Sequence, residues 1–262
     1  MPQRQPGLLS RPCPQGGSGL VGVAFFDADR DGWLDLFVAG GRGRPNALFH
    51  NNGDGTFTDI AVEAGVANGL GNSGVVAADL DNDGFQDLFL TNDGGLVGSP
   101  VKLYRNQGDL TFADITAGSG IIGPESNLSA AFADLDNDGF LDLFITAPGS
   151  LADKVQHANQ LYHNNGDLTF TDISVSSGVN TALGACATFF SDYDRDGWID
   201  LFVADCNDVN FARTPIELFR NNRDLTFTDM RLDAGLEEGG SGWVWVRPTT
   251  TTTAISISLP PT

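Results

Sequence analysis

Four loops of nine residues, all with the same spacing of acids, constrain this chain most strongly. The second loop runs from Asp79 to Asp87 as Asp-Leu-Asp-Asn-Asp-Gly-Phe-Gln-Asp, with acids at positions 1, 3, 5 and 9. Alternating acids place their carboxylates on one side of a tight loop, and Gly at position 6 permits the sharp turn that closes it. The carbonyl at position 7 and the acid at position 9 can complete an all-oxygen cage, which suits Ca²⁺.

The same spacing recurs three times, in loops that begin at Asp27, Asp134 and Asp192. One such loop is a moderate signal, because Asp and Gly are common turn residues, and the alternative is a set of acidic surface turns. Four copies with identical internal spacing favour metal binding. Without a cation, each loop would crowd four like charges together.

An EF-hand is the competing interpretation of these loops. Its loop needs Glu at position 12 and lies between two helices. Position 12 is apolar in all four loops here: Val38, Leu90, Ile145 and Val203. A short run of β-type residues, such as Leu-Asp-Leu-Phe-Val at residues 34–38, follows each loop. We therefore expect a strand after the loop and not a helix.

Composition excludes two classes of function. The chain has 262 residues, of which 41% are hydrophobic, and this is enough for a sizeable core. The formal net charge is −20, and the four loops hold sixteen of the 34 acidic residues, so binding to nucleic acid is not expected. No run of about 18 apolar residues occurs, so we expect no membrane span.

The cell compartment is inferred from calcium and from cysteine. Residues 1–17 carry Arg4 and Arg11 but no apolar segment, so they are not a signal peptide. Loops of this type suit the calcium level outside cells, so we expect an extracellular or cell-surface protein with a lost leader, the alternative being a protein that stays inside.

Cys186 lies six residues before the fourth loop and Cys206 six residues after it. This symmetry predicts a disulfide between facing strands, with two buried thiols as the alternative.

A second block of residues follows each loop, and the whole unit repeats every 52 to 58 residues. In the first repeat the block is residues 48–60, and its Asn-Asn-Gly-Asp core is a turn signal between two strands. Each repeat thus predicts four short strands, in the first repeat near residues 22–26, 34–39, 46–50 and 56–60. We interpret the recurring Phe as a core anchor and the recurring Asp as a turn cap: Phe57, Phe112, Phe170 and Phe227, and Asp59, Asp114, Asp172 and Asp229.

A four-stranded antiparallel unit repeated at this interval indicates an all-β fold made of β-propeller blades. A β-solenoid, which usually has shorter repeats, and a row of separate small domains are the alternatives. The expected organisation is an unassigned segment at 1–18, four visible blades at about 19–72, 73–127, 128–185 and 186–242, and a non-blade tail at 243–262.

These motifs resemble FG-GAP/VCBS-type repeats. The resemblance rests on the Asp-x-Asp-x-Asp-Gly-x-x-Asp loop, the Asp-Leu-Phe strand and the Asn-Asn-Gly-Asp-x-Thr-Phe-x-Asp block, and it covers about residues 19–242. The unit is most similar to the cartilage acidic protein and UnbV-like family. That family implies an extracellular calcium-binding β-propeller, often of seven or eight blades, that serves adhesion or recognition.

Carried over by position, the resemblance implies about four Ca²⁺ sites. In each loop the ligands are the four acids and the main-chain carbonyl of position 7. They are Asp27, Asp29, Asp31, Trp33 and Asp35; Asp79, Asp81, Asp83, Phe85 and Asp87; Asp134, Asp136, Asp138, Phe140 and Asp142; and Asp192, Asp194, Asp196, Trp198 and Asp200.

The tail at 243–262 fits no blade. It reads either as a flexible Thr-rich tail or as a frameshift product. Decoded one frame over with suitable third bases, residues 248–258 give Ala-Asp-Tyr-Asp-Asn-Asp-Gly-Asp-Leu-Asp-Leu, which is the loop again. This hypothesis places a frameshift near Gly242 and implies the loss of at least a fifth blade. We therefore expect an incomplete larger propeller, with a closed four-bladed ring as the alternative.

Strand order predicts two faces. The metal loops and the Asn-Asn-Gly-Asp turns share one face, and the connections after the second and fourth strands share the other. Those after the second strand vary most, and we place a protein or glycan ligand site there, the alternative being that they are merely tolerant loops. They are residues 40–45, 91–101, 146–158 and 204–215.

Catalysis finds little support in the sequence. His50 and His163 occupy matching positions that are filled by Arg105 and Arg220 in the other repeats, which indicates a solvated strand site, and His157 is the third His. The acids repeat regularly, whereas a catalytic pair should occur once. We expect a recognition or adhesion module without catalysis. The alternatives are a polysaccharide lyase or glycoside hydrolase on the same scaffold, and a segment of a larger surface protein.

Overall fold

The computed structural model describes residues 22–41, 44–69, 71–92, 101–124, 127–147, 157–180, 185–205 and 216–236. This part of the chain folds into sixteen strands in four separate antiparallel sheets of four strands each. The all-β propeller-blade prediction is confirmed. The expected segment at 1–18 and the tail at 243–262, with its frameshift hypothesis, lie outside the described residues, as does Cys206.

Each sheet is a meander in which strands that follow one another in sequence pair side by side. The first blade contains β1 (Val23–Phe26), β2 (Asp35–Val38), β3 (Ala47–Asn51) and β4 (Phe57–Asp59), and the second contains β5 (Asn72–Ala78), β6 (Asp87–Asn92), β7 (Lys102–Asn106) and β8 (Phe112–Asp114). The third contains β9 (Ala130–Ala133), β10 (Asp142–Ile145), β11 (Gln160–Asn164) and β12 (Phe170–Asp172), and the fourth contains β13 (Ala185–Ser191), β14 (Asp200–Asp205), β15 (Ile216–Asn221) and β16 (Phe227–Asp229). Two short helical turns are η1 (Thr116–Gly118) and α1 (Ser174–Ser177).

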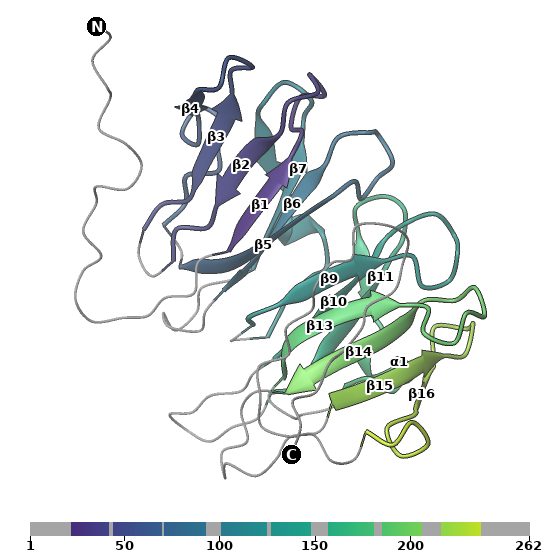
Figure 1. Ribbon diagram of the computed structural model, residues 1–262. Helices are drawn as coiled ribbons and strands as arrows, with labels where there is room; N and C mark the ends of the chain where they lie inside the picture. Colours follow the sequence, from purple (N-terminus) through teal and green to yellow (C-terminus); the bar gives the residue numbers. More distant parts are fainter. Residues whose placement is uncertain are drawn as a thin grey trace, which may run out of the picture.

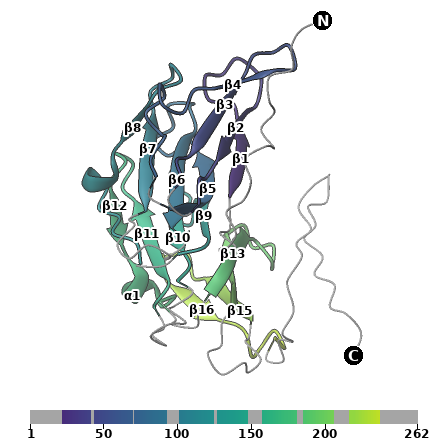
Figure 2. The same ribbon diagram turned by 90° about the vertical axis from the view of Figure 1, so that its left-hand side faces the viewer.

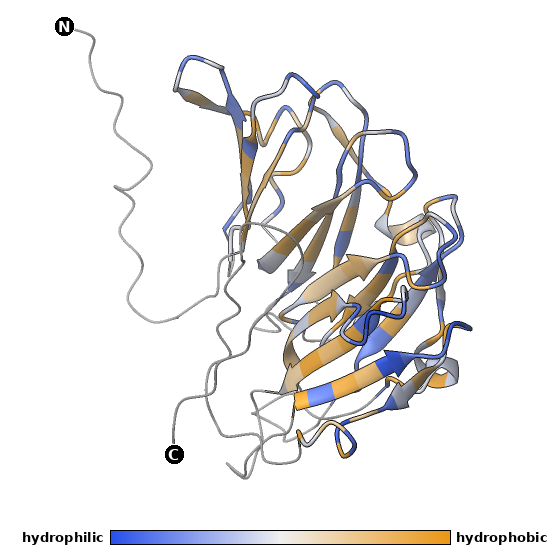
Figure 3. Ribbon diagram, turned by 45° about the vertical axis from the view of Figure 1, so that its right-hand side comes forward, coloured by the Kyte–Doolittle hydropathy of each residue, from blue (hydrophilic) through white to orange (hydrophobic). Residues whose placement is uncertain are grey.

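The blades pack face to face in chain order, as Figures 1 and 2 show. The first strands of consecutive blades touch: β1 contacts β5, β5 contacts β9, and β9 contacts β13. β6 and β10 are buried along their whole length, because each is an inner strand of a blade with a neighbour on both faces. Apolar residues therefore fill the strands while polar residues gather at the loops, as the colours of Figure 3 show.

The hydrophobic core is divided into three clusters, and each lies between consecutive blades. An edge-to-face pair of Phe rings crosses every one of these interfaces. The ring centroids are 6.3 Å apart for Phe26 and Phe112, 6.0 Å for Phe89 and Phe132, and 6.5 Å for Phe144 and Phe190. Among the described residues no cluster joins the first blade to the fourth, so these blades form an open arc.

The open side of the first blade is apolar. Val23 and Phe25 of β1 are 58% and 60% exposed, and Phe57 of β4 is 46% exposed. The equivalent Phe of the later blades is only 5–8% exposed, because it packs against the blade before it: Phe112, Phe170 and Phe227. The prediction of a core anchor is thus confirmed for three positions and wrong for Phe57, which has no preceding blade among the described residues to cover it.

The expected division into two faces is confirmed. On one face the Nδ2 group of Asn51, at the end of β3, donates to the carbonyl of Leu34 in the first acidic loop, at 3.1 Å. At the other end of the sheet Asn46 accepts from the backbone N–H of Gly40 and donates from Nδ2 to the carbonyl of Val66. No helix in the described part of the chain is long and apolar enough to cross a membrane.

The structure also bears on two smaller predictions. Each turn-cap Asp accepts from the backbone N–H two residues later, as in the bond from Ala61 to Asp59 at 3.1 Å and that from Thr116 to Asp114 at 3.1 Å. Cys186 is disulfide-bonded, which excludes a free thiol at this position. The pairing of Cys186 with Cys206 stays a prediction.

Candidate metal centres

All four acidic loops adopt the same backbone conformation. Position 4 is left-handed in each, with φ between 59° and 62°, at Arg30, Asn82, Asn137 and Arg195. Left-handed backbone is uncommon for residues other than glycine. Position 6 has φ between 88° and 93°, which explains its invariant use of Gly: Gly32, Gly84, Gly139 and Gly197. The identical spacing in sequence thus produces an identical loop in space.

Backbone N–H groups orient the acids at positions 1, 3 and 5 of each loop. In the second loop the N–H of Gly84 donates to Asp79 at 2.9 Å, that of Asp83 to Asp81 at 3.3 Å and that of Phe85 to Asp83 at 2.9 Å. The matching bonds of the other loops fall between 2.7 and 3.3 Å. These bonds fix the carboxylates at positions 1, 3 and 5 within each loop, and their role as metal ligands stays a prediction.

The carboxylate oxygens of these acids come close enough to share one ion. In the second loop oxygens of Asp79, Asp81 and Asp83 lie within 4.8 Å of one another. The same holds for Asp134, Asp136 and Asp138 in the third loop and for Asp27, Asp29 and Asp35 in the first. In the fourth loop the same backbone hydrogen bonds position Asp192, Asp194 and Asp196.

This donor set fits Ca²⁺. The acids of each loop offer carboxylate oxygens, which hard cations prefer. Asp79 Oδ1 is buried and has no hydrogen-bond partner, so this oxygen is left available for a cation. The residues at position 7 of the four loops are Trp33, Phe85, Phe140 and Trp198. That their main-chain carbonyls are further metal ligands stays a prediction.

The acid at position 9 differs from the other three because it is buried. Asp87 Oδ2 accepts from the N–H of Leu80 at 3.2 Å, and its Oδ1 accepts from the N–H of Asn106 at 2.9 Å. Burial raises the pKa of Asp87 to about 7, and it raises the pKa of Asp142 and of Asp200 to about 6. The other loop acids raise these pKa values further, whereas the backbone bonds lower them. A bound cation would favour the ionised form of these acids.

One Asn in each of the second, third and fourth repeats has a role that the sequence did not reveal. Asn164 Nδ2 donates to the carbonyl of Leu141 in its own loop at 3.2 Å and to that of Leu80 in the preceding loop at 3.0 Å. Asn106 and Asn221 make the same pair of bonds. We predicted only a turn at this Asn-Asn-Gly-Asp motif. The recurrence of the same Asn at the end of every third strand was the available signal.

The position before this Asn also contacts the loop. His50 and His163 are 22% exposed and Arg105 at the equivalent position is 45% exposed, so the predicted solvated strand site is partly screened from water. Their Nδ1 atoms lie 3.0 Å from Asp35 Oδ1 and 2.9 Å from Asp142 Oδ1. These contacts belong to tertiary structure, because the acid and the imidazole come from different strands.

The opposite face carries a hollow with a polar lining. A cavity of about 390 Å³ opens in the third blade, beside the connection that leads into β11. Its polar lining comes from His157, Asn159, Gln160, Asp172, Ser174 and Asn180. His157 lies in one of the variable connections in which the sequence predicted a ligand site. Most of the other variable connections, residues 93–100, 148–156 and 206–215, lie outside the described residues.

The chain is similar in sequence to a family of repeats and to named relatives. The family described as FG-GAP-like repeat matches residues 27–90 and 79–145. Cartilage acidic protein 1 of Homo sapiens is 30% identical over 206 residues, which cover 76% of this chain and 29% of that protein. The protein of the same name from Xenopus tropicalis is 31% identical over 218 residues, or 79% of this chain and 32% of that one. The chain thus spans about three tenths of the length of the curated relatives it matches.

Among solved structures, one neighbour is an Agrocybe aegerita lectin described as specifically recognising non-reducing terminal N-acetylglucosamine. The TM-score is 0.48 and the sequence identity 21%. The match covers 80% of this chain and 52% of that chain.

Proposed function

Because the chain is an FG-GAP-like repeat protein similar to cartilage acidic protein 1, we propose that it is a calcium-binding, extracellular recognition module that binds a protein or a glycan without catalysis. The observation that carries the proposal is the four-fold repetition of one loop. Each copy has the same left-handed positions and the same backbone bonds to acids at positions 1, 3 and 5.

Bound Ca²⁺ would supply a positive charge that neutralises the acids of each loop. The chain's own residues then transmit that order between blades. The Nδ2 group of Asn164 joins the carbonyls of Leu80 and Leu141, and these belong to loops of the second and third blades. A loop fixed by calcium would thus hold the next blade as well. We infer that calcium makes the arc of blades a rigid support.

Recognition is assigned to the face opposite the metal loops. The cavity in the third blade supports this assignment, since its side chains offer amide, hydroxyl, carboxylate and imidazole groups. Sugar hydroxyls and polar peptide groups are bound by such side chains. A site on that face also leaves the metal loops free for their structural role.

Two further observations support the remaining parts of the proposal. The disulfide at Cys186 is typical of proteins in oxidising compartments outside the cytosol. The four acidic loops are equivalent in conformation, and this favours a structural role over a catalytic pair, which would be unique.

A glycan array combined with a reducing-end assay tests the proposal. Calcium-loaded protein should bind one glycan class on the array. If the ligand is a protein, it should instead retain a defined component of an extracellular-matrix extract. In either case the bound ligand should not be cleaved. His157→Ala with Gln160→Ala should abolish that binding, because both side chains line the cavity. Thr171→Ala, on an exposed strand position of the same blade, serves as the matched control.

The outcomes separate recognition from catalysis. Binding that is lost in the cavity variant and kept in the control supports the proposal. Release of new reducing ends that saturates with substrate would contradict it and favour a hydrolase or lyase. Binding that survives the cavity variant would overturn the assignment to this face.

A further inference from the structure

The four metal loops fall into two classes according to the residue that the third strand of each blade places beside them. That residue directly precedes the inter-blade Asn and is Arg105 in the second blade. Arg105 Nη2 lies 2.7 Å from Asp81 and 3.2 Å from Asp83, the acids at positions 3 and 5. This strand position therefore delivers a positive charge to the acids of its loop.

The fourth blade resembles the second. Arg220 occupies the same strand position and shares a hollow of about 250 Å³ with Asp194 and Asp196. A further guanidinium, that of Arg223, lies 2.8 Å from Asp196 Oδ2. In both blades a side chain of the protein itself thus supplies the cation that contacts the loop acids.

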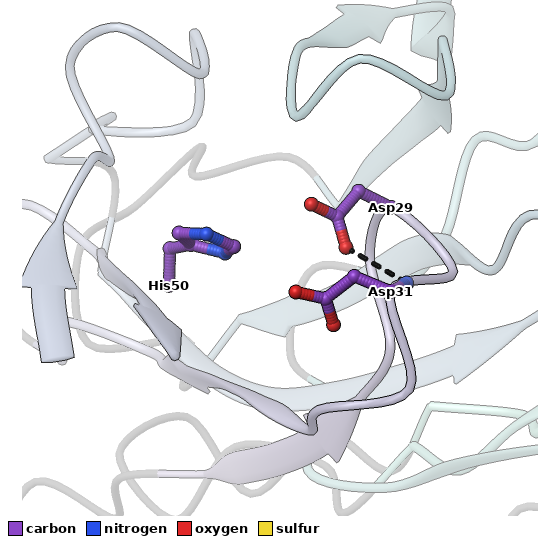
Figure 4. A group of neighbouring side chains, drawn as sticks. All are labelled: Asp29, Asp31 and His50. Carbon is purple, nitrogen blue, oxygen red and sulfur yellow. Dashed lines mark hydrogen bonds between the residues drawn. The ribbon is translucent and has the colours of Figure 1, made fainter. Parts of the chain in front are cut away.

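The first and third blades have an imidazole where the others have a guanidinium. In the first blade a ring nitrogen of His50 and oxygens of Asp29 and Asp31 lie within 4.8 Å of one another. Figure 4 shows the imidazole and the two carboxylates around one space, with the ring on β3 and the acids on the loop. The third blade groups His163 with Asp136 and Asp142, the acids at positions 3 and 9 of its loop, and His163 Nδ1 lies 3.8 Å from Asp136 Oδ2.

From this geometry we propose that the first and third blades each hold a mixed nitrogen and oxygen site for a divalent transition-metal ion of the Zn²⁺ class, while the loops flanked by Arg accept only Ca²⁺. The inference rests on the proposed function, since it assumes that the loops bind metal. One imidazole with two carboxylates is a donor set that suits Zn²⁺, whereas oxygen alone suits Ca²⁺. A guanidinium has no lone pair to offer a metal.

The hydrogen bonds of the structure allow the imidazole to serve as a ligand. If Nδ1 of His50 binds a metal, Asp35 Oδ1 keeps the bond from the backbone N–H of Asn51 at 2.8 Å. Asp142, which is itself one of the two acids of the third-blade group, keeps on Oδ1 the bond from the N–H of Asn164 at 2.9 Å. The buried acids at position 9 are therefore not left without partners when the ring changes its role.

Calorimetric titration of metal-free protein with Zn²⁺, alone and in the presence of saturating Ca²⁺, tests the proposal. The wild type should bind about two Zn²⁺ per chain through His50 and His163. His50→Arg or His163→Arg should each remove one equivalent, because they copy the second and fourth blades. The reciprocal Arg105→His should add one. X-ray absorption at the zinc edge should report one imidazole nitrogen per site in the wild type.

A calcium titration of the same samples distinguishes the failure of this inference from that of the proposed function. Calcium binding with no specific Zn²⁺ binding, or with a Zn²⁺ equivalent count that the His variants leave unchanged, would overturn the two-class proposal alone. If folded wild-type protein binds neither Ca²⁺ nor Zn²⁺, the result would contradict the proposed function. Melting curves of each variant in Ca²⁺ establish that it is folded.

Discussion

At the residue scale, the buried acids at position 9 connect the proposed metal binding to pH. The ordinary Asp pKa is 3.8, and the folded state raises that of Asp87 to about 7 and those of Asp142 and Asp200 to about 6. Without metal, the folded chain therefore binds more protons than the unfolded chain between pH about 4 and 7. Stability falls as pH rises wherever the folded state holds more protons. These acids thus cost stability at neutral pH, and the cost disappears as pH falls through their raised pKa values.

We expect metal-free protein to melt at a higher temperature at pH 5 than at pH 7.5. Thermal melts of protein stripped with EDTA, followed by circular dichroism across this range, measure the difference. Asp87→Asn should reduce it, because the amide does not titrate. A melting temperature that rises from pH 5 to pH 7.5 in metal-free wild type would contradict the assignment of buried, protonated acids.

The inter-blade Asn gives a second prediction at this scale. Asn164→Ala removes the donors to the carbonyls of Leu80 and Leu141 and should cost about 1–3 kcal/mol, the usual penalty for buried groups left unsatisfied. Asn51→Ala is the matched control, because Asn51 donates to its own loop at Leu34. Urea unfolding of both variants measures the costs. Equal costs would exclude a stabilising bond between blades.

At the element scale, the strands were predictable and the burial of their faces was not. The alternation in segments such as Asp-Leu-Phe and the turn signals predicted four strands per repeat, and the structure has them within a few residues. Phe57 and Phe170 occupy the same position in equivalent strands, yet one is 46% exposed and the other 5%. Local sequence does not distinguish them, because burial depends on the blade that precedes.

This difference between blades predicts unequal effects of one substitution. Phe170→Ala should destabilise the protein by about 3–5 kcal/mol, because it removes a ring buried between the second and third blades. Phe57→Ala should cost less than about 1.5 kcal/mol, since much of that ring is already in water. The measurement is the free energy of unfolding in urea with saturating Ca²⁺. A cost for Phe57 equal to that for Phe170 would show that another surface covers the open side of the first blade.

In the candidate site, too, some features were predictable from the sequence and others were not. The acids at positions 1, 3 and 5 were predictable, because a loop of nine residues fixes their geometry locally. The contacts of His50, Arg105 and Asn164 with the loops were not, because they come from a strand that begins well beyond the loop or from the next blade. Local spacing therefore identifies the acids, while the tertiary fold decides what accompanies them.

At the scale of the whole molecule, the four blades form an arc held by three apolar interfaces. The expectation of a propeller larger than a closed four-bladed ring stays a prediction, and in the described part of the chain the first blade exposes Val23 and Phe25. Every blade also carries an acidic loop on the same face, so metal removal would leave like charges along the whole arc. Calcium and the interfaces between blades should therefore stabilise the molecule together.

The measurement that tests this account most directly is a thermal melt in EDTA and in millimolar Ca²⁺, with Mg²⁺ as the control. A ligand at about 100 times its dissociation constant contributes roughly 2.7 kcal/mol for each site on the folded state. Each kcal/mol moves the midpoint of a domain of this size by about 2–4 °C. Four sites should thus raise the midpoint by more than about ten degrees in Ca²⁺ and by much less in Mg²⁺. An unchanged midpoint in folded protein would contradict the account, because the acids would then be solvated turns.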